Sequence, residues 1–201
     1  MKLFYSPTSP YARKCRALAI EKGIEGQLEI ITASPMSNPP ALQAANPLGK
    51  VPALLLDNGQ CIVDSPVICA YLDNLTDAPR LIPADPVARI DALTREALAD
   101  GIMDAAFAIV MERKRPELQR SPEWLERWTS AIHRSVAHFG ARIPTRQQPD
   151  IGDLALVCAL AYVDFRLGDL AWDAKAPALR AWLSSLHARP SLSATAPPPG
   201  A

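Results

Sequence analysis

Short apolar runs and helical spacing alternate over the first 32 residues of the chain. Residues 3–5 (Leu-Phe-Tyr) predict a strand, and the turn-forming residues 6–8 follow it. A helix is then predicted from Ser9, a favoured N-cap residue, through Pro10 at its first position to Gly23 at a left-handed end. The β-branched content of residues 28–32 predicts a second strand. This part of the chain is therefore expected to form a strand–helix–strand unit.

The segment that follows is expected to contain a loop, a hairpin and another helix. Asp57-Asn58-Gly59-Gln60 is a tight-turn signal between two apolar runs. The expected elements are a loop at 33–40, one or two helical turns at 41–45, strands at 52–57 and 61–63, and a helix from 65 to about 75. This order predicts a small mixed sheet with helices on its faces.

The second half of the chain shows only helical spacing. Residues 77–86 contain three prolines and predict a linker. Asp85 and Pro86 suit the start of a long helix, for which Pro116 sets the latest end. Further helices are expected from 122 to about 143, from 150, and from 177, and residues 191–201 are expected to be a loose tail.

Composition and charge exclude several classes of partner. The 201 residues have a formal net charge of zero, with 49% hydrophobic and 21% charged residues, so nothing favours nucleic acid or an anionic membrane surface. The strongly apolar run at 154–163 is too short to span a bilayer, and no signal peptide is recognisable. The cysteines, which lie far apart without metal-ligand spacing, predict reduced thiols in a cytoplasmic protein without a metal site: Cys15, Cys61, Cys69 and Cys158.

One motif at the first strand-to-helix turn indicates a protein family. Ser9-Pro10-Tyr11-Ala12 stands where thioredoxin-like redox proteins carry C-P-Y-C, so this chain resembles that framework with both cysteines replaced. Two later segments match the same framework, residues 46–54 (NPLGKVPAL) and residues 64–68 (DSPVI). On these motifs the chain resembles the glutathione S-transferase superfamily over nearly its whole length, and in particular small serine-type bacterial glutathione transferases.

The resemblance implies both a fold and a domain organisation. The implied fold is an α/β thioredoxin-like N-terminal domain followed by an all-α C-terminal domain. We expect the glutathione-binding domain at residues 1–76, the linker at 77–86 and the helical domain at 87–201. The family also implies a homodimer, which nothing in the composition demonstrates.

Ser9 is the expected catalytic residue. In the family a hydroxyl near this turn donates to the sulfur of bound glutathione and stabilises the thiolate, and the N-terminus of a helix also favours an anion. By itself Ser9 is equally suited to cap the helix without any catalytic role. Ser6 and Thr8 are rival hydroxyls, although neither takes the place of the first cysteine of C-P-Y-C.

Two further segments are expected to hold glutathione. In the family the proline before the third strand is cis and the residue before it, here Val51, binds the cysteinyl part of the peptide through its backbone, while Lys50 reaches the glycine end or is simply solvated. Ser65 is expected to bind the γ-glutamyl carboxylate, with Asp64 facing the α-amino group. Asp64 is one methylene shorter than the usual Glu and reaches less far, and the pair also suits a plain helix cap.

The second substrate is expected in a cleft between the domains. Tyr11, Met103, Phe107 and Met111 are the candidates to line it, although the last three also suit a core-facing helix stripe. Asp100 and Asp104 either meet the γ-glutamyl amino group from a partner subunit or lie on a solvated helix face. Asp150 and Asp153 resemble the family's capping box, which is a folding feature.

The expected function is attack of the glutathione thiolate on a small hydrophobic electrophile. One alternative is a glutathione-dependent peroxidase or thiol–disulfide reductase, although Ser9 and Ala12 both lack sulfur. The other alternative is a non-catalytic glutathione-binding module used for interactions.

Overall fold

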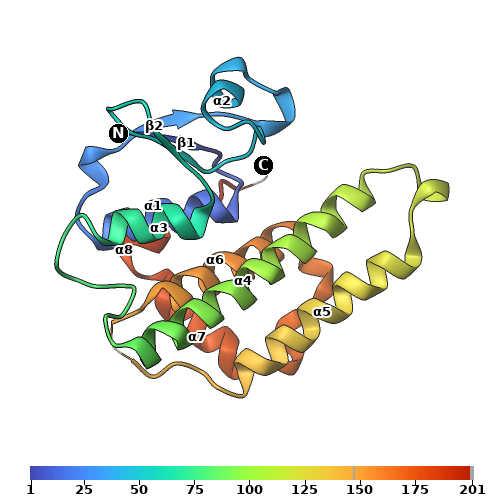
Figure 1. Ribbon diagram of the computed structural model, residues 1–201. Coiled ribbons are helices and arrows are strands. Elements are labelled where there is room, and N and C mark those ends of the chain that lie inside the picture. The colour runs from blue at the N-terminus through green and yellow to red at the C-terminus, as the bar shows by residue number, and fades with distance from the viewer. Residues whose placement is uncertain (147, 200–201) are drawn as a thin grey trace.

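A four-stranded mixed sheet forms the centre of the N-terminal domain (Figure 1). The computed structural model describes residues 1–146 and 148–199. The strands lie in the order β2-β1-β3-β4, with β1 parallel to β2 and antiparallel to β3. Their bounds are Lys2–Tyr5 for β1, Glu29–Thr32 for β2, Ala53–Leu55 for β3 and Cys61–Ile62 for β4. The mixed sheet and the hairpin expected from the sequence are confirmed.

Helices cover both faces of this sheet because successive strand residues point to opposite sides. Leu3 and Leu54 join the core formed with α1 (Pro10–Glu21) and α3 (Ser65–Asp73). Phe4 and Ala53 face the other way and pack with Leu42 of α2 (Pro40–Ala45). In Figure 1, α1 and α3 lie side by side between the sheet and the C-terminal helices.

The C-terminal domain consists of helices in the part of the chain that the structure describes. They are α4 (Pro86–Arg113), α5 (Pro122–Gly140), α6 (Ile151–Arg166), α7 (Pro177–His187) and α8 (Pro190–Ser193). Short 3₁₀ turns are found at Glu25–Gln27, Pro35–Ser37, Glu117–Gln119, Gly168–Leu170 and Trp172–Lys175. None of the helices in the described part of the chain combines the length and the apolar character needed to span a bilayer.

Helix α6 is the buried centre of this domain and carries the expected capping box. Residues 151–163 are all buried, against α4 on one side and α1 on another. At its start Asp150 accepts from the Asp153 N–H, and Asp153 accepts from the Asp150 N–H. The strongly apolar run of the sequence therefore belongs to a core helix.

The expected loose tail is wrong for its first residues. From Pro190 the chain forms α8, which packs on α1. Ser191, Leu192 and Thr195 are buried. Leu192 belongs to the hydrophobic core, and the Thr195 hydroxyl donates to the Ser191 carbonyl at 2.7 Å. The proline-rich sequence did not indicate this, since the apolar signal of a single leucine is weak. The end of the tail at residues 200–201 lies outside the described residues.

Candidate functional site

Ser9 occupies the N-cap of α1, where its hydroxyl has a free hydrogen. The Ser9 Oγ accepts from the Ala12 N–H at 3.2 Å, and Pro10 takes the first helical position. A serine hydroxyl has one hydrogen to donate besides its acceptor lone pairs. The structure gives that hydrogen no acceptor among the described residues. Capping the helix and donating to a ligand are therefore compatible roles for Ser9.

The two rival hydroxyls contact each other. Ser6 Oγ and Thr8 Oγ1 lie 3.3 Å apart, so one donates to the other. Of the three hydroxyls in this turn, only that of Ser9 caps the helix, where the positive end of the helix dipole lies.

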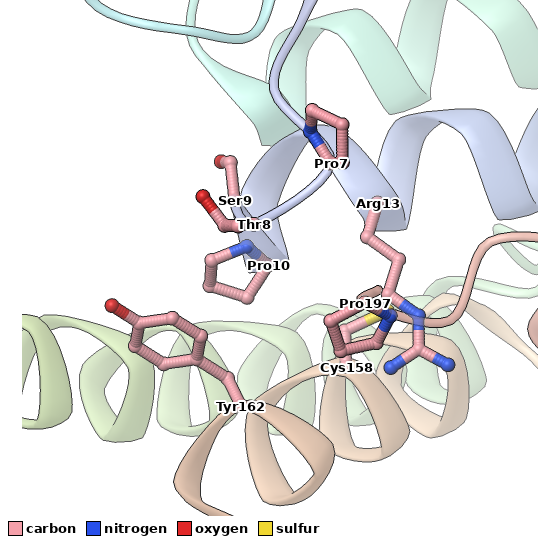
Figure 2. A pocket seen from close by; sticks show the side chains of 8 residues that line it. All are labelled: Pro7, Thr8, Ser9, Pro10, Arg13, Cys158, Tyr162 and Pro197. Carbon is pink, nitrogen blue, oxygen red and sulfur yellow. The ribbon is translucent and has the colours of Figure 1, made fainter. Parts of the chain in front are cut away.

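A small, shallow pocket opens beside Ser9 (Figure 2). Its walls come from the β1–α1 turn, from α1 and α6, and from the C-terminal segment. The lining residues are Pro7, Thr8, Ser9, Pro10, Arg13, Cys158, Tyr162 and Pro197. Of these residues, Ser9 was expected at the site and Thr8 was named as a rival hydroxyl. Arg13 follows Ser9 by one helical turn, a spacing visible in the sequence, whereas only tertiary packing brings α6 and Pro197 to this place.

The four residues expected to line a substrate cleft do not line this pocket. Met103 has no exposed surface and belongs to the core, so that expectation is wrong. Phe107 is 42% exposed and Met111 is half-buried, so they remain predictions without a described cavity. Side chains four residues apart on a helix differ in direction by about 40° around its axis. The row formed by Met103, Phe107 and Met111 therefore begins in the core and leaves it further along the helix. Tyr11 packs against the core and donates its hydroxyl hydrogen to Asp104.

The Val51–Pro52 peptide bond is cis, as the resemblance implied. Ala53 pairs with Phe4 of β1, so the preceding residues Val51 and Pro52 lie alongside the chain that leaves β1 toward Ser9. Asn46, which is buried, donates to the Lys50 carbonyl at 2.8 Å and accepts from the Leu48 N–H at 3.0 Å. Asn46 therefore fixes the loop that presents Val51, a role that was not expected from the sequence. The side chain of Lys50 is exposed.

Ser65 lies at the start of α3 with an unpartnered hydroxyl. Its Oγ is buried and has no hydrogen-bond partner among the described residues, and the residue is only 1% exposed. Its N–H donates to the Asp64 carboxylate, which is the N-cap of α3. The Cys15 Sγ lies 3.7 Å from the Ser65 carbonyl, so the first turn of α3 is next to α1. Because the Ser65 N–H is taken by Asp64, the hydroxyl is the Ser65 donor that is left available for a ligand.

Asp100 and Asp104 both have partners within the chain. The Lys14 Nζ lies 2.7 and 2.8 Å from the two carboxylate oxygens of Asp100 and 2.8 Å from Glu96 Oε1. Burial raises the pKa of Asp100 to about 6, although Lys14 lowers it. Asp104 is exposed and accepts from Tyr11. A solvated helix face therefore describes Asp104 better than Asp100, and contacts of either residue with a partner subunit stay a prediction.

The cysteines are free thiols and most of them lie in the core. Cys15 and Cys69 are buried with their sulfur atoms 3.7 Å apart, and Cys158 is buried under α1. Burial raises the pKa of Cys158 to about 11 and the pKa of Cys69 well above its ordinary value. Thiols held in the protonated form are poor nucleophiles. Within the described residues, no group of three or more His, Cys, Asp or Glu is placed to hold a metal.

Known proteins resemble this chain over most of its length. It matches the family models for the glutathione S-transferase N-terminal domain at residues 8–75 and C-terminal domain at residues 122–185. It is 37% identical to an uncharacterized GST-like protein, YibF of Escherichia coli K12, over 98% of this chain and 99% of that protein. It is also 29% identical to a maleylacetoacetate isomerase of Pseudomonas aeruginosa, over 84% of this chain and 83% of that protein.

A solved structure agrees with these sequence matches. A glutathione transferase family member from Pseudomonas fluorescens Pf-5, crystallised with bound glutathione, has a TM-score of 0.94 and 41% identity, covering 98% of each chain. The same relative with bound S-(propanoic acid)-glutathione gives a TM-score of 0.90 and 40% identity, over 98% of this chain and 100% of that one. Together with the Ser9 turn, the cis proline and the two-domain fold, these matches show that the chain belongs to the glutathione S-transferase family.

Proposed function

We propose that the protein is a glutathione transferase in which Ser9 stabilises the glutathione thiolate for attack on an electrophile. The observation that carries the proposal is the Ser9 hydroxyl, which caps α1 and keeps its own hydrogen to donate beside a pocket. The relative crystallised with glutathione, and with a glutathione that bears a propanoic acid group on sulfur, supports a site at which the sulfur becomes substituted.

The energetics of one hydroxyl are sufficient for this role. A free thiol has a pKa of about 8.5, so only a few per cent is ionised at neutral pH. Lowering that pKa by about two units requires roughly 2.7 kcal/mol. A hydrogen bond to a charged group supplies about 1.5–3 kcal/mol, and a helix N-terminus adds roughly 0.3–1 kcal/mol.

The peptide would be held by groups that have no other partner. Ser65 would donate its unpartnered hydroxyl to the γ-glutamyl carboxylate, while the backbone of Val51 would pair with the cysteinyl residue. Asp64 is exposed and would face the α-ammonium group. A buried hydroxyl without a partner costs about 1–3 kcal/mol, which a ligand carboxylate would offset.

Conjugation is favoured over thiol–disulfide chemistry by the state of the cysteines. A disulfide reductase of this framework needs a reactive thiol at the turn, where this chain has Ser9 and Ala12. Cys15 lies deeper in α1 without exposed surface. A peroxidase that uses only the bound glutathione thiolate would need no protein thiol and stays an alternative to conjugation.

An isomerisation is the second candidate, because one relative is a maleylacetoacetate isomerase. A thiolate that adds to a double bond and later leaves would use the same Ser9 and would return glutathione unchanged. Counting glutathione consumed per product formed separates the two reactions, since only conjugation consumes it in equal amounts.

A homodimer in the cytoplasm completes the proposal. Exposed aliphatic side chains on α3 and α4, namely Val67, Val87 and Ile90, are the candidate contact surface. Light scattering measures the assembly directly.

The test of the proposed function is the ionisation of bound glutathione in Ser9→Ala. We expect the thiol pKa, followed by thiolate absorbance against pH, to rise by about one to two units while glutathione affinity changes little. Ser9→Gly is the matched variant, because Gly at an N-cap costs only a few tenths of a kcal/mol and also lacks the hydroxyl. Titration curves of both variants that coincide with wild type would reduce Ser9 to a helix cap. If none of the proteins binds glutathione, the proposal fails altogether.

A further inference from the structure

Arg13 is a buried cation that no carboxylate neutralises in the part of the chain that the structure describes. The residue is 3% exposed. Its Nη2 donates to the Leu192 carbonyl at 2.9 Å and its Nε lies 3.4 Å from Thr195 Oγ1. Its Nη1 is buried without any hydrogen-bond partner among those residues. A guanidinium keeps its charge under all ordinary conditions, so this arrangement leaves a positive charge uncompensated inside the protein.

The titratable groups near Arg13 supply no negative charge. Burial raises the pKa of the Cys158 thiol to about 11, although Arg13 lowers it, so the thiol is neutral at physiological pH. Burial and Arg13 both lower the pKa of His187, whose buried Nε2 also has no partner among the described residues. A neutral thiol and a neutral imidazole do not balance a guanidinium.

Arg13 belongs to the pocket of Ser9. Arg13 and Ser9 stand four positions apart in the sequence, and both line this pocket. In Figure 2 the Arg13 side chain runs from α1 down to Pro197 and Cys158, while Ser9 and Thr8 lie above Pro10 at the start of the helix and point away from Arg13. The polar side chains of the lining are hydroxyls, a thiol and this guanidinium, with no carboxylate among them. The lining is therefore suited to an anion.

We propose that Arg13 forms a carboxylate subsite next to Ser9, so that the electrophile carries a carboxylate close to the carbon that the thiolate attacks. The inference rests on the proposed function, because it places the sulfur of glutathione at Ser9. The carboxylate pairs with the free Nη1 of Arg13. Pro197 covers this end of the pocket and lies within residues 196–199, which form neither helix nor strand. The ligand therefore enters by displacing residues 196–199.

The reaction balances without any further reagent. With a haloalkanoic acid, the sulfur–carbon bond forms as the carbon–halogen bond breaks, and the halide leaves with the bonding electron pair. The thiol proton has already passed to solvent when the thiolate forms beside Ser9. Arg13 takes no part in bond making, since it binds the carboxylate and orients the neighbouring carbon toward sulfur.

The binding test compares two glutathione derivatives of nearly equal size that differ by one charge. Calorimetry measures the affinities of S-carboxymethylglutathione and S-carbamoylmethylglutathione, with plain glutathione as the reference. We expect wild type to bind the acid about ten-fold more tightly than the amide, as one charge-assisted hydrogen bond provides. Arg13→Gln should bring the ratio close to one while plain glutathione binds as before. Arg13→Lys should keep part of the preference, because it keeps the charge.

Two control variants separate the charge of Arg13 from its structural contacts. Arg16→Gln removes a positive charge one turn further along α1, where the guanidinium pairs with Glu25 at 2.8 Å, and should leave the ratio unchanged. Thr195→Val removes the partner of Arg13 Nε without changing any charge, and should also preserve the preference. A loss of preference in Arg16→Gln equal to that in Arg13→Gln would overturn the proposal.

The wild-type ratio tests the subsite even if Arg13→Gln does not fold. Equal affinity of wild type for the acid and the amide overturns the carboxylate subsite, while tight binding of plain glutathione in the same experiment leaves the proposed function standing. The kinetic counterpart is the ratio of kcat/KM for iodoacetate to that for iodoacetamide, each corrected for its uncatalysed rate. We expect this ratio to fall about ten-fold in Arg13→Gln and to stay constant in Arg16→Gln, as the loss of one charge-assisted hydrogen bond predicts.

Discussion

Lys14 and Arg13, which are adjacent in α1, each bury a positive charge, but on different sides of the helix and among different polar neighbours. Lys14 points toward α4, where Glu96 and Asp100 lie within 2.8 Å of its ammonium group. Arg13 points toward α8 and the C-terminal segment, where its polar contacts are a carbonyl and a hydroxyl. Both residues are at most 3% exposed. The first side contains a closed ion-pair cluster, and the second contains a cation with an unused donor.

The comparison distinguishes a buried charge that is paired within the protein from buried polar groups that have a donor free for a ligand. Burial by itself would lower the pKa of Lys14, but its neighbours, Asp100 and Glu96 among them, raise it above the ordinary value, so the ammonium form is secured within the protein. Arg13 Nη1 and Ser65 Oγ have no such partner among the described residues. Because an unpartnered buried polar group is costly, a ligand that supplied the missing partner would be bound more tightly for it.

Removing Lys14 should have the largest effect on stability. Lys14→Met leaves Glu96 and Asp100 buried without their cation, which should lower the free energy of unfolding by about 3–5 kcal/mol. Urea unfolding followed by circular dichroism measures this loss. Arg13→Met is the matched control, because it strands no carboxylate in the described structure and should cost clearly less. Equal losses for the two variants would contradict the comparison.

Removing the Ser65 hydroxyl should weaken binding without weakening the fold. Ser65→Ala should weaken glutathione binding roughly ten-fold or more, since a hydrogen bond to a charged group is worth about 1.5–3 kcal/mol. The free energy of unfolding without ligand should not fall and should rise by up to about 1–3 kcal/mol, because the substitution removes a buried hydroxyl that has no partner in the described structure. Calorimetry with glutathione and urea unfolding test the two halves separately. Unchanged affinity would show that the γ-glutamyl carboxylate binds elsewhere.

The pH dependence of stability should give the smallest of the three effects. The pKa of Asp100 is about 6 in the folded protein, above the ordinary value of 3.8, so between these values the folded state binds more protons than the unfolded state. This group therefore adds stability as the pH falls from 7 to 4, and that stability is lost as the pH rises through 6. The stability of wild type relative to Asp100→Asn should increase by about 1–2 kcal/mol over that range. A flat or opposite difference would mean that Lys14 holds Asp100 ionised.

Much of the fold could be predicted from the sequence because its signals are local. Ser9, Asp85 and Asp150 each cap the helix that they were expected to start. Gly23, at φ +68°, follows α1 as expected, and Gly59, at φ +86°, forms the hairpin turn. These residues act through their own backbone and their nearest neighbours, so their positions in the chain are enough to reveal them.

The expectations that failed concern which residues meet across the domains. Met103 lies in the core although its spacing suited a cleft, because periodicity identifies a helix stripe without saying what covers it. The C-terminal segment looked loose, yet Arg13 and Glu21 of α1 anchor it through Leu192, Thr195, Arg189 and Ser191. Each of those contacts joins residues that are far apart in the sequence, 182 positions for Arg13 and Thr195 and 168 for Glu21 and Arg189.

The sequence by itself determined the family, the two-domain architecture and the residues at the start of α1, because short motifs and helix caps act over a few positions. Only the tertiary structure decided which buried charges are paired, since pairing depends on distances between α1, α4, α6 and the C-terminal segment. Lys14 and Arg13 are adjacent basic residues in the sequence. Packing alone gives one of them two carboxylates and leaves the other facing a pocket beside Ser9.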